Sequence, residues 1–282
     1  MFESAEIGHR VDKKTYKREE PLLRQALLGA QYELLRQART AVVVLVNGVP
    51  GAGKGETVNL FNEWMDPRHI RTEAFGPAGR DGRPDMYRFW QVLPPKGHIG
   101  ILFGSWYTDP LGDFVTGRDK PDRFHRRLER IRQFEQMLVA EGVVLVKLWF
   151  HLSKKAAKAR YKALESDPRT AWRVSTLEWD HLKHHDEWVR ASDEALRLTG
   201  MGGAPWQVIE GSDPDYRALC AGRLLLDALG ASLAAPPTAP AARRAGAPLA
   251  PSLDGKGLLD TQDYGRRLGH KRYEDQLETL QG

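Results

Sequence analysis

The chain has 282 residues, 41% of them hydrophobic and eight of them tryptophan, so it can bury one sizeable core or at most two small ones. Its net charge of +5 suits a polyanionic ligand, although proteins that bind no polyanion often carry a similar excess. The single Cys220 excludes an internal disulfide, and no apolar run reaches the roughly 18 residues of a membrane span. With no apolar signal core in "MFESAEIGHR", we expect a soluble cytoplasmic protein without a membrane partner.

Short apolar, β-branched runs alternate with helical patterns along most of the chain. The runs that predict buried strands are 41–46, 98–103, 143–150 and 206–210, with 70–75 as a weaker fifth. Helices are predicted over 16–38, 54–65, 84–92, 122–141, 153–165, 178–198 and 213–230. Such alternation indicates right-handed crossovers and a parallel sheet covered on both faces. The predicted fold is therefore α/β, a three-layer α/β/α sandwich of about five strands.

The composition changes beyond residue 232. Residues 1–232 form the predicted globular domain, 233–260 an Ala/Pro-rich linker, and 261–282 a charged helical segment. The last segment matches the first helix at three pairs of positions: Lys14 with Lys271, Tyr16 with Tyr273 and Leu23 with Leu280. We therefore expect a second, truncated copy of the fold to begin there, although two unrelated amphipathic helices could give the same match.

A glycine-rich motif follows the first predicted strand and precedes a helix. Gly48, Gly53 and Lys54 fit G-x-x-x-x-G-K, in which backbone N–H groups, the helix N-terminus and the lysine together attract phosphate. The candidate phosphate-binding residues of this loop are Gly48, Gly51, Gly53, Lys54, Gly55 and Thr57. The alternative is a glycine-rich turn that binds nothing. Gly55 stands where ordinary ATPase and GTPase loops carry a magnesium-binding Ser or Thr, which argues against those classes.

Four segments, in this order, resemble the second polyphosphate kinase family, which moves phosphoryl groups between inorganic polyphosphate and nucleotides. They are "GVPGAGKGETVNLFNEWMDPR", "YRFWQVLPPKGHIGILFGSWY", "FHLSKKAAKARYKALESDPRTAWRVSTLEWD" and "GGAPWQVIEG". The resemblance covers about residues 1–232 and is greatest to the first half of tandem-domain polyphosphate:AMP phosphotransferases. It implies a P-loop kinase-like fold with a helical lid, Mg²⁺ as cofactor, polyphosphate and AMP or ADP as partners, and a homo-oligomer.

The chain departs from the family pattern at two metal-binding positions. Pro50 replaces the loop aspartate, and the third-strand motif F-D-R-S-W-Y is shortened to "FGSWY", so that its aspartate and arginine are missing around Gly104. No metal-binding side chain is therefore predicted, although phosphate oxygens and water could partly replace the lost ligands. The nearby acids expected in loops, none with the spacing of a substitute, are Asp81, Asp85, Asp109 and Asp113.

The basic segment 153–173 resembles the family's lid over the polyphosphate channel. Because "DPRTAWRVS" matches the lid motif, the resemblance implies phosphate contact for Arg169 and Arg173, with Arg173 and Lys54 as the catalytic pair. Half of the lysines in this segment are expected in solvent. Arg88, in "YRFW", is similar to a phosphate-facing position of the family; its alternative role is to pair with neighbouring acids.

Two weaker patterns are interpreted as structural. His181 and His185 have a spacing able to bind zinc, but a solvated helix face is the better interpretation because the metalloprotease glutamate is missing. Aromatic residues that fall in or beside apolar runs are predicted to be core: Phe89, Trp90, Trp149, Trp172 and Trp206. No nucleic-acid-binding motif is present, so no nucleic acid is expected as a partner.

Three functions remain open from the sequence. The first is an enzyme that transfers a phosphoryl group from polyphosphate to AMP, or in reverse, with Lys54 steadying the group. The second is a catalytically degenerate copy that binds polyphosphate or supports an active second domain, which the loss of acids at Pro50 and near Gly104 favours. The third is an ATP-dependent nucleotide kinase. For this segment alone, weak or absent catalysis is the expectation.

Overall fold

The computed structural model describes residues 1–76, 86–200, 203–235, 265, 267 and 269–281. The chain divides into two compact units, Met1–Pro237 and Thr238–Gly282. The larger unit contains a five-stranded sheet in the order β2-β3-β1-β4-β5, in which every neighbouring pair is parallel. The strands are β1 (Val42–Gly48), β2 (Ile70–Ala74), β3 (Ile99–Phe103), β4 (Val144–His151) and β5 (Trp206–Glu210).

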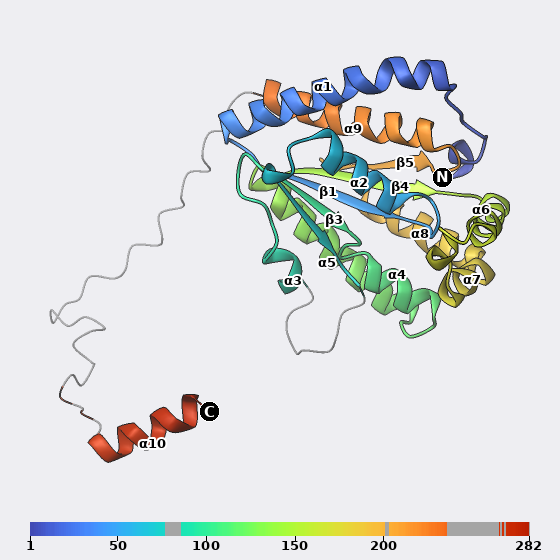
Figure 1. Cartoon of the computed structure of the whole chain (residues 1–282). Coiled ribbons are helices and arrows are strands. Elements are labelled where there is room, and N and C mark those ends of the chain that lie inside the picture. Colours follow the sequence, from blue (N-terminus) through green and yellow to red (C-terminus); the bar gives the residue numbers. More distant parts are fainter. Residues whose placement is uncertain (77–85, 201–202, 236–264, 266, 268, 282) are drawn as a thin grey trace. The chain divides into compact units, whose positions relative to one another are not determined.

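Helices cover both faces of this sheet (Figure 1). One layer contains α1 (Lys13–Gln37), α2 (Lys54–Trp64) and α9 (Pro214–Ala234); the other contains α4 (Thr108–Val115), α5 (Pro121–Ala140) and α8 (His185–Thr199). The short α3 (Tyr87–Trp90) follows β2 in the chain, and α6 (Lys154–Ser166) and α7 (Thr176–Lys183) lie beyond the carboxyl ends of the strands. The three-layer α/β sandwich with five parallel strands is confirmed.

Burial explains why some strand patterns are clearer than others. β1 is the central strand, and its residues from Val42 to Asn47 are all buried, so it reads as one unbroken apolar run. β2 is an edge strand with mostly exposed or half-buried residues, and its pattern is correspondingly weak. The core is thus built around β1, and the loop that follows β1 starts from the buried central strand of the sheet.

The first helix is fixed by its cap and by close packing on α9. The Asp12 carboxylate accepts a hydrogen bond of 2.9 Å from the Thr15 N–H at the start of α1. Leu23 is buried against α9, where a β-carbon at Gly222 would lie 2.7 Å from Leu23 Cδ2. Each buried leucine of this kind contributes about 2 kcal/mol. The packing holds α9, and with it Arg217, firmly against the sheet.

Several predicted elements differ from the structure. The helix predicted over 178–198 is two helices, α7 and α8, separated at His184. The acids Asp109 and Asp113 lie in α4 rather than in loops, because Pro110 is tolerated in the first turn of a helix whose Leu111 faces the core. The observed α3 is shorter than the predicted 84–92; residues 84 and 85 lie outside the described ranges.

Two of the aromatic residues predicted to be core are not buried. Trp90 is 47% exposed, although Phe89 in the same short helix is buried, and Trp172 is 77% exposed in the 3₁₀ helix Ala171–Arg173. Phe89 and Trp149 are buried, and Trp206 is half-buried. A position in or beside an apolar run therefore predicted burial correctly for some of these aromatic side chains but not for Trp90 and Trp172.

The predicted linker falls mostly outside the described part of the chain, whereas the segment predicted as a second copy is described at 265, 267 and 269–281. Helix α9 continues to Ala234, two residues into the predicted linker, and residues 236–264 are not described. The smaller unit contains one described helix, α10 (His270–Gln281). Its assignment as the start of a second copy stays a prediction. Among the described residues, no helix combines the length and apolar character that a membrane crossing requires.

Candidate active site

The glycine-rich loop leaves β1 and enters α2 with three residues in the left-handed half of φ space. Gly48, Gly51 and Gly53 have φ angles of 140°, 77° and 84°. A β-carbon at Gly48 would overlap the backbone of Phe150 on β4, and one at Gly51 would lie 2.6 Å from the Tyr161 ring. The glycines of the motif are therefore required by backbone conformation and by the close approach of neighbouring elements.

Lys54 is the first residue of α2, and its side chain folds back over the loop. Its Nζ donates hydrogen bonds of 2.5 Å to the Gly48 carbonyl and 3.0 Å to the Val49 carbonyl. Burial lowers the pKa of Lys54 to about 8, an effect that Glu178 opposes. The loop carbonyls thus hold a weakly solvated ammonium at the position where the motif places a phosphate-binding cation.

The other loop candidates differ in position. Gly55 is the second residue of α2 and leaves open space beside Phe103, since a β-carbon there would lie 3.9 Å away. Thr57 is buried, and its hydroxyl donates to the Gly53 carbonyl at 3.1 Å, inside the helix. The structure therefore does not bring the Thr57 hydroxyl to the side of the loop that a ligand would occupy.

A cavity of about 350 Å³ opens beside the loop and is mainly apolar. Its lining residues are Val46, Asn47, Gly48, Val49, Pro50, Lys54, Ala74, Phe75, Gly76, Phe103, Gly104, Thr108, Leu111, Trp149, His181, Trp188 and Ser192. Two of them, Trp149 through Nε1 and Ser192 through Oγ, present buried polar atoms that have no hydrogen-bond partner within the described residues. A ligand with acceptor atoms would satisfy both groups.

The residues around this cavity do not fit a metal ion. Pro50 and Gly104 line it where the family pattern has aspartates. Gly104 has a φ of 76°, and a β-carbon there would clash with the Phe75 carbonyl oxygen at 2.6 Å. Asp113 is engaged by Arg127 at 2.7 Å, while Asp81 and Asp85 lie outside the described residues. In the described ranges, no three His, Cys, Asp or Glu side chains form a possible metal site. Among the residues that the structure describes, none is placed to hold the Mg²⁺ implied by the resemblance.

Arg88 has the alternative role considered for it. Its Nη2 donates to Asp109 at 2.7 Å and its Nη1 to the Gly76 carbonyl at 2.9 Å, while the guanidinium lies 4.7 Å from the Phe89 ring centroid. Asp109 is half-buried, so this pair fixes α3 against α4. Phosphate contact by Arg88 stays a prediction, since its guanidinium has five N–H donors and these two contacts use only part of them.

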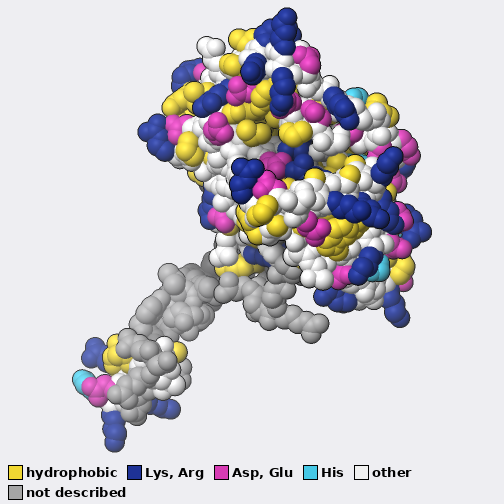
Figure 2. Space-filling model, turned by 45° about the vertical axis from the view of Figure 1, so that its right-hand side comes forward, with side chains coloured by type: hydrophobic (Ala, Val, Ile, Leu, Met, Phe, Trp, Pro, Cys, Tyr) yellow, Lys and Arg dark blue, Asp and Glu magenta, His cyan; other side chains and the backbone are white. Residues whose placement is uncertain are grey.

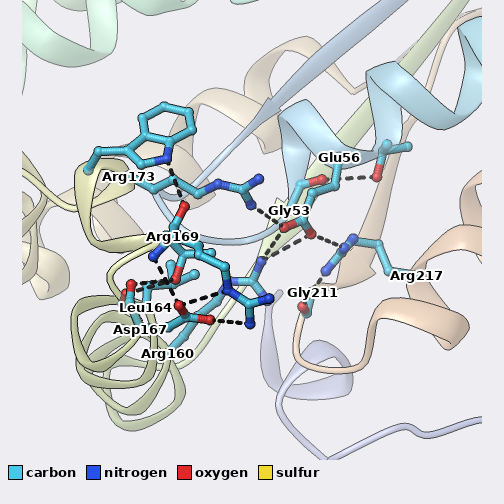
Figure 3. A network of polar contacts seen from close by, with 12 residues as sticks. Gly53, Glu56, Arg160, Leu164, Asp167, Arg169, Arg173, Gly211 and Arg217 are labelled. Atoms are coloured by element: carbon cyan, nitrogen blue, oxygen red, sulfur yellow. Dashed lines mark hydrogen bonds and ion pairs between the residues drawn. The ribbon is translucent and has the colours of Figure 1, made fainter.

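The two arginines predicted for the lid are separated by the structure (Figure 3). Arg169 is 88% exposed and pairs with Asp167 at 2.9 Å. Arg173, at the end of the 3₁₀ helix Ala171–Arg173, instead lies 3.4 Å from Glu56 in the first turn of α2. Only Arg173 therefore reaches the phosphate loop.

Glu56 also binds two arginines that were not among the predicted site residues (Figure 3). Arg160 of α6 lies 2.8 Å from its carboxylate, and Arg217 of α9 forms a second ion pair with it. Glu56 follows Gly55 in the motif and Arg160 lies in the basic segment, so both carried a signal in the sequence. Nothing in the sequence marked Arg217 as a site residue, because α9 follows the loop by more than 150 residues.

Charge is mixed on the face of the molecule that Figure 2 shows. Figure 2 shows lysine and arginine side chains spread over the visible face and interspersed with acidic ones, rather than gathered into one continuous basic patch. Many lysines and arginines of the lid are paired, such as Lys154 with Asp186 at 2.8 Å. The positive charge available to the phosphate loop therefore comes from nearby side chains rather than from a basic surface patch.

The two histidines are not on a solvated helix face, and that interpretation was wrong. His181 is in α7 and lines the cavity, with its ring centroid 5.0 Å from that of Trp188, and burial lowers its pKa. His185 is a buried residue at the start of α8, with Nε2 3.0 Å from the Leu152 carbonyl oxygen. The break at His184 directs the two rings into different environments.

Known proteins of similar sequence carry the same phosphate-transfer family assignment that the glycine-rich loop indicates. The family model described as polyphosphate kinase 2 (PPK2) matches residues 10–235. The chain is 48% identical over 283 aligned residues to a polyphosphate:AMP phosphotransferase of Pseudomonas aeruginosa, covering all of this chain and 57% of that protein. It is 32% identical over 180 residues to a GDP-polyphosphate phosphotransferase of Mycobacterium tuberculosis, covering 63% of this chain and 61% of the relative.

Solved structures give the same grouping. A putative polyphosphate kinase 2 from Pseudomonas aeruginosa superposes with a TM-score of 0.75 at 43% identity, covering the whole of this chain and 54% of that one. Polyphosphate kinase 2 from Arthrobacter aurescens superposes with a TM-score of 0.76 at 26% identity, covering 81% and 83% of the two chains. The present chain spans a little over half the length of the two Pseudomonas phosphotransferases that it matches. On these grounds, the chain belongs to the polyphosphate kinase 2 family.

Proposed function

We propose that the protein takes part in polyphosphate-dependent phosphoryl transfer to a nucleotide, in which inorganic polyphosphate and AMP give ADP and a polyphosphate chain one phosphate shorter, or the reverse. The observation that carries this proposal is the ammonium of Lys54, held over a glycine loop and lining a cavity of about 350 Å³. The names of relatives, among them the polyphosphate:AMP phosphotransferases, supply the donor and acceptor classes.

The cavity supports a nucleotide in chemical terms. Its apolar lining suits a purine ring, and the unpartnered Trp149 N–H and Ser192 hydroxyl suit the acceptor atoms of such a ring. Lys54 lines the same cavity and suits the phosphate end of the ligand. The chain's own residues would thus bind and orient the two reactants, which is most of what phosphoryl transfer asks of a protein.

A second candidate, a copy that binds the reactants but transfers little, is favoured by one observation. Pro50 and Gly104 stand where the family pattern has metal-binding acids, and the described residues offer no replacement. The homo-oligomeric state, the cytoplasmic location and the absence of nucleic acid as a partner stay predictions from the sequence.

The test measures both binding and turnover by the 282-residue chain. Inorganic tripolyphosphate and AMP are titrated separately by calorimetry, and ADP formation is followed with polyphosphate or with ATP as the sole donor. Lys54→Ala should weaken tripolyphosphate binding by at least about tenfold, a loss of about 1.4 kcal/mol. Lys14→Ala, which removes an exposed lysine of α1, is the matched control.

The outcomes separate the candidates. ADP formation from polyphosphate that depends on Lys54 supports an active enzyme, and Lys54-dependent binding without turnover supports the binding copy. Turnover with ATP but not with polyphosphate would contradict the proposal, as would tripolyphosphate binding that Lys54→Ala leaves unchanged.

A further inference from the structure

Three arginines from separate elements converge on one carboxylate beside the phosphate loop (Figure 3). Arg160 Nη2 donates to Glu56 Oε1 and Oε2 at 2.8 and 3.0 Å, and Arg173 Nη1 lies 3.4 Å from Oε1. Arg217 Nη2 donates to Oε2 and its Nη1 to the Gly211 carbonyl at 2.9 Å. We call Arg160, Arg173 and Arg217 the arginine cluster.

The arginine cluster has more positive charge and more donors than Glu56 can satisfy. Three guanidinium groups face one carboxylate, and the local charge stays positive even when Asp213, which also interacts electrostatically with Arg217, is counted. The side chain of Arg217 is only 2% exposed, so water does little to solvate its charge. The Nε atoms of Arg160 and Arg217 are buried and find no acceptor among the described residues. Such a site stabilises further negative charge and further acceptor oxygens.

The position of the cluster ties it to the loop and to the lid. The Arg217 guanidinium packs directly against Gly53, so it lies under the loop. Arg160 and Arg173 belong to the segment of α6 and the following 3₁₀ helix, and Glu56 joins this segment to the first turn of α2. The carboxylate therefore stands between the loop and the lid.

We propose that Glu56 is an internal substitute for a phosphate group: its carboxylate fills an oligophosphate-binding site formed by the arginine cluster, and a bound inorganic oligophosphate displaces it. The inference rests on the proposed function, because it places the phosphate chain of that proposal at this loop. An oligophosphate has the multiple charges and acceptor oxygens that three guanidinium groups require, whereas one carboxylate has only two oxygens. Glu56 is 36% exposed, so its side chain has space to leave.

The test is calorimetric titration of the 282-residue chain with inorganic tripolyphosphate. Glu56→Gln should bind tripolyphosphate at least about fivefold more tightly than the wild type, which corresponds to about 1 kcal/mol. Glu63→Gln is the matched control. Glu63 is an exposed glutamate of the same helix, so its substitution removes the same charge at a position away from the arginine cluster. Adding Arg160→Gln to Glu56→Gln should abolish the gain.

A second variant, Glu56→Asp, tests the inference if Glu56→Gln does not fold. Glu56→Asp keeps the charge but withdraws the carboxylate from the cluster, so it should also bind tripolyphosphate more tightly, by a smaller factor. Equal affinities for the Glu56 variants and Glu63→Gln would overturn the inference. If Lys54→Ala still weakened binding in that case, the proposed function would stand. A gain in Glu56→Gln that is indifferent to Lys54 would support the inference and contradict the role proposed for Lys54.

Discussion

The guanidinium of Arg217 lies so close to Gly53 that any β-carbon at position 53 would overlap it. Gly53 also has a φ of 84°, which side chains rarely adopt. A residue near the end of the domain thus supports the last glycine of the phosphate motif, and the same guanidinium binds Glu56 in the next turn.

Gly53→Ala should therefore destabilise the fold by about 2–3 kcal/mol, because it combines strained backbone with displacement of a buried arginine. The control is Gly230→Ala in α9, where nothing lies within 4 Å of a β-carbon. That change should stabilise the helix by up to about 1 kcal/mol. Urea denaturation measures the free energy of unfolding of both variants. If Gly53→Ala lowered it by no more than an ordinary surface substitution, the contact with Arg217 would be contradicted.

The low pKa of Lys54 predicts a pH dependence with a definite sign. The folded pKa of about 8 is below the ordinary 10.5, so the unfolded chain binds more protons between these values and stability rises with pH in that window. Tripolyphosphate binding should change in the opposite direction and weaken as pH rises through 8, since the ammonium loses its charge. Lowered pKa values keep Glu178 and His181 from titrating in this range.

The measurement is the affinity for tripolyphosphate at pH 7 and pH 9.5 in the wild type and in Lys54→Met. The difference between the two proteins should be largest at pH 7 and small at pH 9.5. A constant difference across this range would show that the ammonium keeps its charge, contrary to the prediction.

A buried ion pair supports the retained part of the third-strand motif. Lys147 Nζ lies 2.7 Å from Glu135, and the other oxygen of that carboxylate accepts from Trp106 Nε1 at 3.0 Å and the Tyr107 hydroxyl at 2.7 Å. Lys147→Met leaves the Glu135 charge buried without its cation, so it should lower the free energy of unfolding by about 3–5 kcal/mol.

Glu135→Gln added to Lys147→Met should recover part of this loss, because the amide oxygen still accepts from Trp106 and Tyr107. Lys154→Met breaks the exposed pair with Asp186 and should cost less than about 1 kcal/mol. Denaturant titrations of the three variants decide the point; equal costs for Lys147→Met and Lys154→Met would be the contrary result.

Restoring an acid at position 104 should fail to rebuild a metal site. Gly104 is left-handed and faces the Phe75 carbonyl, so Gly104→Asp is expected to destabilise the fold by about 2 kcal/mol or more. The variant should show no gain in Mg²⁺ affinity by calorimetry. Tight Mg²⁺ binding with unchanged stability would mean that the shortened motif can still hold the family's geometry.

Much of the fold could be predicted because it depends on local pattern. The strand 206–210 and the helix that starts at Lys54 were placed within a residue or two, since buried runs and the glycine motif mark them in the chain itself. The segment of α4 that carries Asp109 and Asp113 was expected to be a loop, whereas it is a helix whose Pro110 and Leu111 are buried.

The site divides in the same way. The phosphate loop and its lysine could be identified from the sequence alone, as could the family and the loss of acids at Pro50 and Gly104, because each depends on residue type at a fixed spacing. The folded chain was needed to show that Arg169 faces solvent, that Trp172 is exposed and that Arg217 supports the loop. The physical reason is that a charge finds its partner through space: the carboxylate of Glu56 selects arginines from α6 and α9, at distances along the chain that no local pattern records.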